Sequence, residues 1–164
     1  MALADRLGSL EMPGKAVPPE NWHITLRFLG WTDDVAFDRM LAALDEAALG
    51  PPFDVALGEM GAFPRPRNAT VIWLAASKGL TRLEHLAAEA EEAAQSAGFN
   101  SEDRPFRAHL TVSRVRPAED VSGLIETFSD AGLGWRCESV VVYRSHLGRG
   151  GAKYEPLETF PLSR

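Results

Sequence analysis

The chain of 164 residues contains one cysteine, Cys137, and only three lysines among its 17 basic residues. A single cysteine cannot form an internal disulfide, and it excludes a zinc site built from several cysteines. No stretch approaches the run of about 18 apolar residues that a membrane-spanning helix needs. Asp5 and Arg6 interrupt the apolar start of the chain, so we expect that this stretch is not a signal peptide. We therefore expect a cytoplasmic protein that does not associate with a membrane.

Several kinds of cofactor site are also missing from the sequence. It has no His-x-His, no His-Glu-x-x-His and no cysteine cluster, so no metal site is predicted. The glycine-rich residues 148–151 lack the Lys-Ser/Thr pair of a phosphate-binding P-loop. A net charge of −6 argues against a broad basic face that binds long nucleic acids. These absences predict an enzyme or binding protein that uses neither a metal nor a bound cofactor.

Two of the four histidines are followed by threonine two residues later, in matching surroundings. Residues 21–26 read Asn-Trp-His-Ile-Thr-Leu, and residues 107–112 read Arg-Ala-His-Leu-Thr-Val. Alternation of polar and apolar residues predicts a β-strand with His and Thr on one face. Two such strands would offer an acid, a base and two hydrogen-bond donors. Those groups are sufficient to break a phosphate ester without a metal.

The elements around the two motifs follow the same order, which indicates an internal duplication of the type β(His-x-Thr)–α–β–β. We expect one bilobal domain over residues 1–164 with half-repeats at about 20–76 and 105–162. The predicted fold is α+β, with two pseudo-symmetric lobes, each an antiparallel sheet with helices on its outer face, and the active-site cleft between them. Strands are predicted at 22–29, 53–57, 70–75, 106–115, 135–143 and 154–160; helices at 3–10, 35–49, 81–97 and 119–129; loops at 11–20 and 61–68.

The flanks of both motifs resemble a known family. Residues 18–30 (PPENWHITLRFLG) and 104–114 (RPFRAHLTVSR) are similar to the two motifs of the bacterial and archaeal RNA 2′,3′-cyclic phosphodiesterases, historically called 2′-5′ RNA ligases. These belong to the two-histidine (2H) phosphoesterase superfamily. The resemblance runs from about residue 16 to the end. Family members usually begin with a strand of the form Arg-x-Phe-x-Ala-Leu, which has no counterpart here, so we expect a lobe sheet without it.

The resemblance implies metal-independent hydrolysis of RNA 2′,3′-cyclic phosphate ends to a 2′-phosphate. By the family pattern, His23 is the general acid and His109 the base, although the sequence alone leaves this assignment open. Thr25 and Thr111 would donate hydrogen bonds to the phosphate oxygens. The reverse reaction, 2′-5′ ligation, would need no ATP. Arg114 would contact the phosphate as well.

Three further residues are candidate substrate ligands. Arg27 and Arg107 share the predicted faces of His23 and His109, and Tyr154 lies on the last predicted strand. Arg114 poses a geometric difficulty, because strict alternation places a residue five positions after His109 on the opposite face. Its role requires the strand to twist or to end by Ser113.

Two other functions remain open at this point. One is a 2H phosphodiesterase acting on a different small cyclic phosphate or on a 2′-5′ oligonucleotide. The other is a non-catalytic module that binds RNA or nucleotides, which is disfavoured because such a module needs neither histidine. In each case the expected partner is an RNA end or a small cyclic nucleotide, and the protein is expected to be a monomer.

Overall fold

The computed structural model describes residues 7, 12–129 and 131–163. The chain divides into two compact units, each built from three separate stretches. The first unit comprises Met1–Ile24, Asp54–Gly79 and Ala108–Trp135; the second comprises Thr25–Phe53, Leu80–Arg107 and Arg136–Arg164.

The helix predicted at residues 3–10 lies outside the described residues apart from Leu7, which is helical. None of the helices in the described part of the chain is long and apolar enough to cross a membrane. The half-repeat boundaries at 20–76 and 105–162 stay a prediction, because the compact units take segments from both halves.

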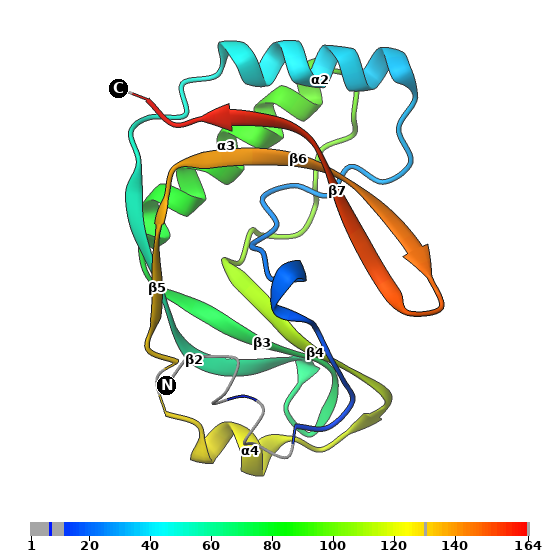
Figure 1. The fold of residues 1–164 in the computed structure, drawn as a ribbon, viewed down its shortest axis with the longest axis vertical. Helices are drawn as coiled ribbons and strands as arrows, with labels where there is room; N and C mark the ends of the chain where they lie inside the picture. The colour runs from blue at the N-terminus through cyan, green and yellow to red at the C-terminus, as the bar shows by residue number, and fades with distance from the viewer. Residues whose placement is uncertain (1–6, 8–11, 130, 164) are drawn as a thin grey trace. The chain divides into compact units, whose positions relative to one another are not determined.

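A five-stranded sheet dominates the first unit, in the order β1-β4-β3-β2-β5 (Figure 1). Neighbouring strands from β1 to β2 pair antiparallel. The short helix α4 (Ser122–Thr127) belongs to the same unit. The strands span Lys15–Ala16 (β1), Phe53–Arg65 (β2), Asn68–Lys78 (β3), His109–Glu119 (β4) and Leu133–Cys137 (β5).

The core of this unit lies on one face of the sheet, where apolar residues alternate with more exposed ones along each strand. Trp22 and Ile24 from the first motif pack against it. The buried residues are Leu57, Met60, Ala62, Ala69, Ile72, Leu74, Leu110, Val112, Val115, Val121 and Ala131.

The loop predicted at residues 61–68 is wrong, because β2 continues to Arg65 and β3 begins at Asn68. Glycine and proline in this stretch suggested a loop. Pairing with β3 overrides that local preference, since Ala62 alternates with Gly61 and Phe63 so as to bury one face of β2.

The N-terminal segment runs antiparallel along the free edge of β4. Lys15 pairs with Arg114, and the amide of Val17 donates to the Val112 carbonyl at 2.9 Å. Gly14 has φ +83°, and a side chain there would collide with the backbone of β4 at Arg114. Only glycine lets the two backbones approach this closely.

The strand predicted at 22–29 is also wrong. Within these described residues only Ile24 forms a bridge, to Leu110, and a 3-10 turn at Pro19–Asn21 (η1) precedes it. The chain leaves the first unit after Ile24, so the residues that follow do not continue along the β4 edge.

Two helices and a β-hairpin form the second unit. Figure 1 shows α2 (Asp34–Glu46) running alongside α3 (Leu80–Ser96), and β6 (Ser139–Gly148) pairs antiparallel with β7 (Gly151–Pro161). Met40 and Leu44 of α2 meet Ala93, Ala94 and Ala97, with Val142 and Phe160 of the hairpin packed against them. Antiparallel strands with helices in both units confirm the predicted α+β class.

Local signals placed the helices of this unit within a few residues. Asp33 caps α2, because its carboxylate accepts the Ala36 amide at 2.8 Å. Helix α3 spans Leu80–Ser96, one residue earlier at each end than the predicted 81–97. The strand predicted at 135–143 divides into β5 and β6.

Candidate active site

A single backbone bridge brings the two His-x-Thr motifs together. Ile24 and Leu110, the central residues of the two motifs, form an isolated antiparallel bridge on the edge of β4. In an antiparallel pairing the neighbours of a bridge lie opposite each other, so His23 lies opposite Thr111 and diagonal to His109. Residues placed diagonally across such a pair are separated by about 7–8 Å, so the two motif histidines lie near each other at this edge of β4.

The faces of this pairing follow from burial. Leu110 is buried, and Ile24 packs against the same core, so both side chains point inward. Successive residues of an extended chain point to opposite faces. His23, His109 and Thr111 are therefore directed away from the core, and each is half-buried.

A backbone carbonyl orients His23. Its Nδ1 lies 2.7 Å from the carbonyl oxygen of Asn21, the last residue of η1. Because a carbonyl oxygen only accepts hydrogen bonds, the Nδ1 atom of His23 carries a proton and donates it to this carbonyl. The indole Nε1 of Trp22 donates to the Val17 carbonyl at 2.9 Å and holds the same turn against the N-terminal segment.

Two aromatic rings flank His109. The centroid of the Phe63 ring lies 5.3 Å from that of His109, nearly perpendicular, and the Trp73 ring lies at 6.1 Å. Edge-to-face contacts of this kind stabilise ring orientation. Sequence reasoning missed both aromatics as neighbours of His109. Phe63 lies in the stretch 61–68, which was expected to be a loop, and Trp73, on a predicted strand, carries no local signal of which ring it contacts. The alternation of Gly61 and Phe63 with buried residues was the signal that could have found Phe63.

Gly61 makes room for this arrangement. It pairs with Trp73 across the β2–β3 ladder, and the indole ring lies over it. A Cβ at this position would lie closer than 3 Å to three carbon atoms of that ring. The tryptophan beside His109 therefore depends on the absence of a side chain on the neighbouring strand.

A β-bulge brings Arg114 to the face of the histidines. Trp73 pairs with Thr111 and Ile72 with Ser113, so Val112 is an extra residue in β4. Val112 and Ser113 are both buried, and the alternation then resumes with Arg114 exposed. The side chain of Arg114 thus leaves β4 on the same face as Thr111. The bulge removes the geometric difficulty that strict alternation raised, and phosphate binding by Arg114 stays a prediction.

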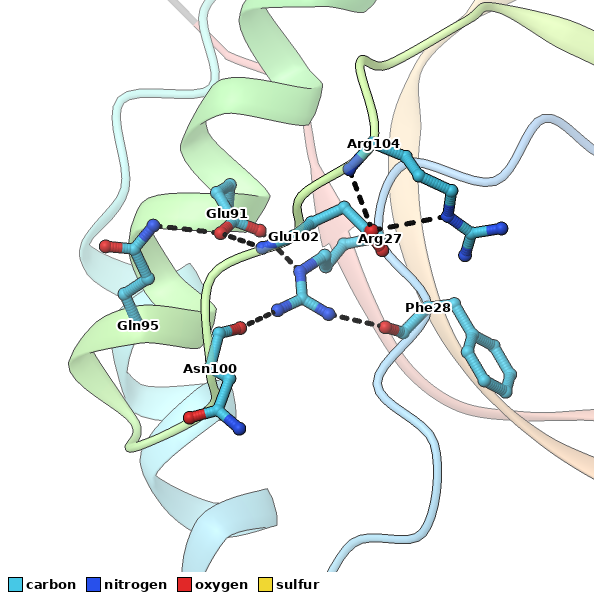
Figure 2. A network of polar contacts seen from close by, with 7 residues as sticks. All are labelled: Arg27, Phe28, Glu91, Gln95, Asn100, Glu102 and Arg104. Carbon is cyan, nitrogen blue, oxygen red and sulfur yellow. Dashed lines mark hydrogen bonds and ion pairs between the residues drawn. The ribbon is translucent and has the colours of Figure 1, made fainter.

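The remaining candidates belong to the second unit. Thr25, which is exposed, follows Ile24 directly, and Arg107, also exposed, precedes the second motif. Tyr154 lies on β7 with its ring 6.2 Å from that of Tyr143. Arg27 pairs with Glu91 (Figure 2).

The described residues hold no group of three or more His, Cys, Asp or Glu side chains arranged to bind a metal ion. Two imidazoles, a hydroxyl and a guanidinium on β4 and on the segment bridged to it are groups that can exchange protons and bind a phosphate. This set of groups defines a class of acid–base phosphoesterases that carry a pair of His-x-Thr motifs.

A comparison with family models identifies the same class of phosphoesterase. The chain belongs to the LigT-like phosphoesterases, whose family model ("LigT like Phosphoesterase") matches residues 1–73 and again residues 74–154. Each match contains one His-x-Thr motif.

Curated relatives have one name in common. The RNA 2′,3′-cyclic phosphodiesterase of Archaeoglobus fulgidus is 37% identical over 148 residues, covering 89% of this chain and 82% of the relative. That of Aeropyrum pernix is 31% identical over 162 residues, covering 94% and 90%.

Solved structures share the fold. TT0787 of Thermus thermophilus superimposes with a TM-score of 0.74 at 32% identity, covering 98% of this chain and 89% of that one. E. coli LigT complexed with 3′-AMP superimposes with a TM-score of 0.82 at 25% identity, covering 99% and 89%.

Gly61→Ala should destabilise the sheet beside His109. The new methyl group would overlap the Trp73 ring, and overpacking of this kind costs about 1–3 kcal/mol of unfolding free energy. Urea denaturation followed by circular dichroism measures the change. Gly148→Ala is the control, because a Cβ there meets no atom within 4 Å. Equal stability of the two variants would contradict the packing of Trp73 over Gly61.

Proposed function

We propose that this protein hydrolyses RNA 2′,3′-cyclic phosphate ends to 2′-phosphates by two-histidine acid–base catalysis without a metal ion. The observation that carries the proposal is the Ile24–Leu110 bridge, which joins the two motifs at their centres. The name shared by relatives that are 31–37% identical supports the substrate class. We further propose that it acts as a monomer in the cytoplasm, on RNA ends or small cyclic nucleotides.

The reaction requires that the attacking water lose a proton and that the leaving ribose oxygen gain one. His109 removes a proton from water as the water oxygen bonds to phosphorus. His23 donates its Nε2 proton to the ribose 3′ oxygen as the bond from that oxygen to phosphorus breaks. The products are a 2′-phosphomonoester and a free 3′ hydroxyl, after which the two imidazoles exchange protons with solvent. Imidazoles suit both steps because they titrate near neutral pH.

Negative charge builds on the non-bridging phosphate oxygens during this attack. The hydroxyls of Thr25 and Thr111 donate hydrogen bonds to those oxygens, and the Arg114 guanidinium adds a charged donor. Arg107 and Tyr154 are further proposed substrate ligands. Ligation to a 2′-5′ linkage is the same chemistry in reverse, with a ribose hydroxyl as the nucleophile.

Loss of either motif histidine should lower turnover strongly. We expect His23→Ala and His109→Ala each to lower kcat by about 10²–10⁴-fold, the usual contribution of a general acid or base. The assay is an oligoribonucleotide ending in a 2′,3′-cyclic phosphate, incubated in EDTA, with chromatography that separates 2′- from 3′-phosphate products.

His85→Ala is the matched control, because His85 bonds to the Ala48 carbonyl of the second unit, away from both motifs in the sequence. Activity lost in EDTA and restored by a divalent cation would overturn the metal-independent mechanism. A 3′-phosphate product would overturn the assigned direction of ring opening.

The acid and base should appear separately in the pH profile. Wild-type kcat should follow a bell-shaped curve, because one imidazole must be protonated and the other neutral. In the residual activity of His109→Ala the acidic limb should disappear, since the base is gone. In His23→Ala the alkaline limb should disappear. The opposite pattern would exchange the two roles.

Arg114→Ala should lower kcat/KM for the cyclic-phosphate RNA by about 10–100-fold, because a charge-assisted contact to phosphate is lost. Arg116→Ala is the matched control, an exposed arginine two residues further along β4. Both variants should retain the wild-type unfolding midpoint. Equal kinetic effects at the two positions would contradict a specific phosphate contact by Arg114.

A further inference from the structure

Arg27 stands four residues after His23, and all three of its guanidinium nitrogens have partners within the protein. Nε pairs with the Glu91 carboxylate, Nη1 donates to the Phe28 carbonyl at 2.6 Å, and Nη2 donates to the Asn100 carbonyl (Figure 2). The side chain is only 10% exposed. The guanidinium is thus held by its own unit, which does not favour the substrate contact predicted for it from the sequence.

Glu91 is held just as firmly. Its second carboxylate oxygen accepts the side-chain amide of Gln95 at 2.8 Å and the backbone amide of Glu102 at 2.9 Å. These two hydrogen bonds, with a further contribution from Arg27, hold the pKa of Glu91 below its usual value. Glu91 therefore stays ionised at neutral pH and remains a full partner for the guanidinium.

The ion pair ties together three stretches of the second unit: the chain after the first motif, helix α3, and the loop at 100–104 (Figure 2). Glu102 extends the network, since its carboxylate accepts the Arg104 amide at 3.2 Å. The loop at 100–104 leads directly into the second motif. One largely buried arginine thus links the exit from one catalytic motif to the approach to the other.

The Arg27 network lies next to two places where the chain crosses from one compact unit to the other. The chain crosses between the two units five times, and two of these crossings fall between Ile24 and Thr25 and between Arg107 and Ala108. Both crossings lie within two residues of a motif histidine. On the side of the first unit, the Ile24–Leu110 bridge holds the two motifs together. On the side of the second unit, the Arg27–Glu91 pair holds the segments that continue from them.

We propose that Arg27 and Glu91 are positioning residues that set the spacing of His23 and His109. They act through the backbone of residues 25–28 and 100–104, and neither touches the substrate. The inference rests on the proposed function for its kinetic consequence. Its geometric content, the placement of two imidazoles, does not depend on what the substrate is.

Three variants test the proposal. Arg27→Gln removes the charge and most of the donors, Glu91→Gln keeps an oxygen for the Glu102 amide while removing the charge, and the double variant removes the pair. Displacement of reacting groups by about 1 Å costs on the order of 100-fold in rate. We expect each single variant to lower kcat by about 10–100-fold with KM within about threefold of wild type. The double variant should be no worse than either single one, because the pair acts as a unit.

Lys78→Gln is the matched control, since Lys78 and Asp54 form an ion pair 3.5 Å apart with both side chains largely exposed. It should leave kcat unchanged. Arg27→Lys restores one charged donor toward Glu91 and should recover part of the lost kcat. A raised KM in Arg27→Gln with an unaffected Glu91→Gln would overturn the proposal in favour of direct substrate binding. A lower unfolding midpoint with unchanged kcat would overturn it in favour of a purely structural role.

NMR separates this inference from the proposed function. In Arg27→Gln and Glu91→Gln the imidazole resonances of His23 and His109 should shift, while that of His146, paired with Glu155 at the surface, should not. This readout holds even if wild-type protein fails to hydrolyse cyclic phosphates, a result that would reject the proposed function alone. Unshifted resonances of both motif histidines would reject the positioning role.

Discussion

Main-chain pairing on both edges of β4 is the constraint on which the candidate site depends. β3 takes one edge, where Ala75 lies opposite His109, and the N-terminal segment takes the other, from Lys15 to Ile24. Backbone amides and carbonyls are costly to leave unpaired, so both registers are strongly fixed. A slip of one residue on the N-terminal edge would turn Ile24 outward and His23 into the core. The chemistry therefore depends on a register that the apolar core enforces.

The bulge at Val112 changes which residues of β4 face outward beyond it. One extra residue lets Val112 and Ser113 both face the core, and it reverses the alternation for everything that follows. The hydroxyl of Ser113 donates to the Pro13 carbonyl at 2.7 Å, so the bulge also anchors the N-terminal segment. The same irregularity thus exposes Arg114 beside the motif and secures the edge that carries His23.

Sequence reasoning succeeded where a signal was local and failed where partners were distant. The helix predicted at 35–49 corresponds to α2, whose observed bounds, Asp34–Glu46, lie within three residues of the predicted ones. The two His-x-Thr motifs were found from spacing alone. By contrast, the strand predicted at 22–29 required a partner strand, and only Ile24 has one.

The aromatic neighbours of His109 show the same limit. Glycine and proline around Phe63 favoured a loop by local preference, and pairing with β3 overrode it. The bulge at Val112 had no local signal either, because valine and serine read as ordinary members of an alternating strand. The pairing of Phe63 with β3 and the bulge at Val112 both depend on contacts between residues that are far apart in the sequence.

The interleaving of the two units has a consequence for how the chain acquires its structure. Each unit is assembled from three stretches, and the first is incomplete until residue 135 has been made. β1 has no partner for its edge until β4 is present, about a hundred residues later. Contacts between residues so far apart in the sequence close long loops. The chain loses the conformational entropy of those loops before the contacts stabilise the fold. Folding of this protein is therefore expected to be largely post-translational and slow for its length, because the contacts that bring the two His-x-Thr motifs together join residues far apart in the sequence.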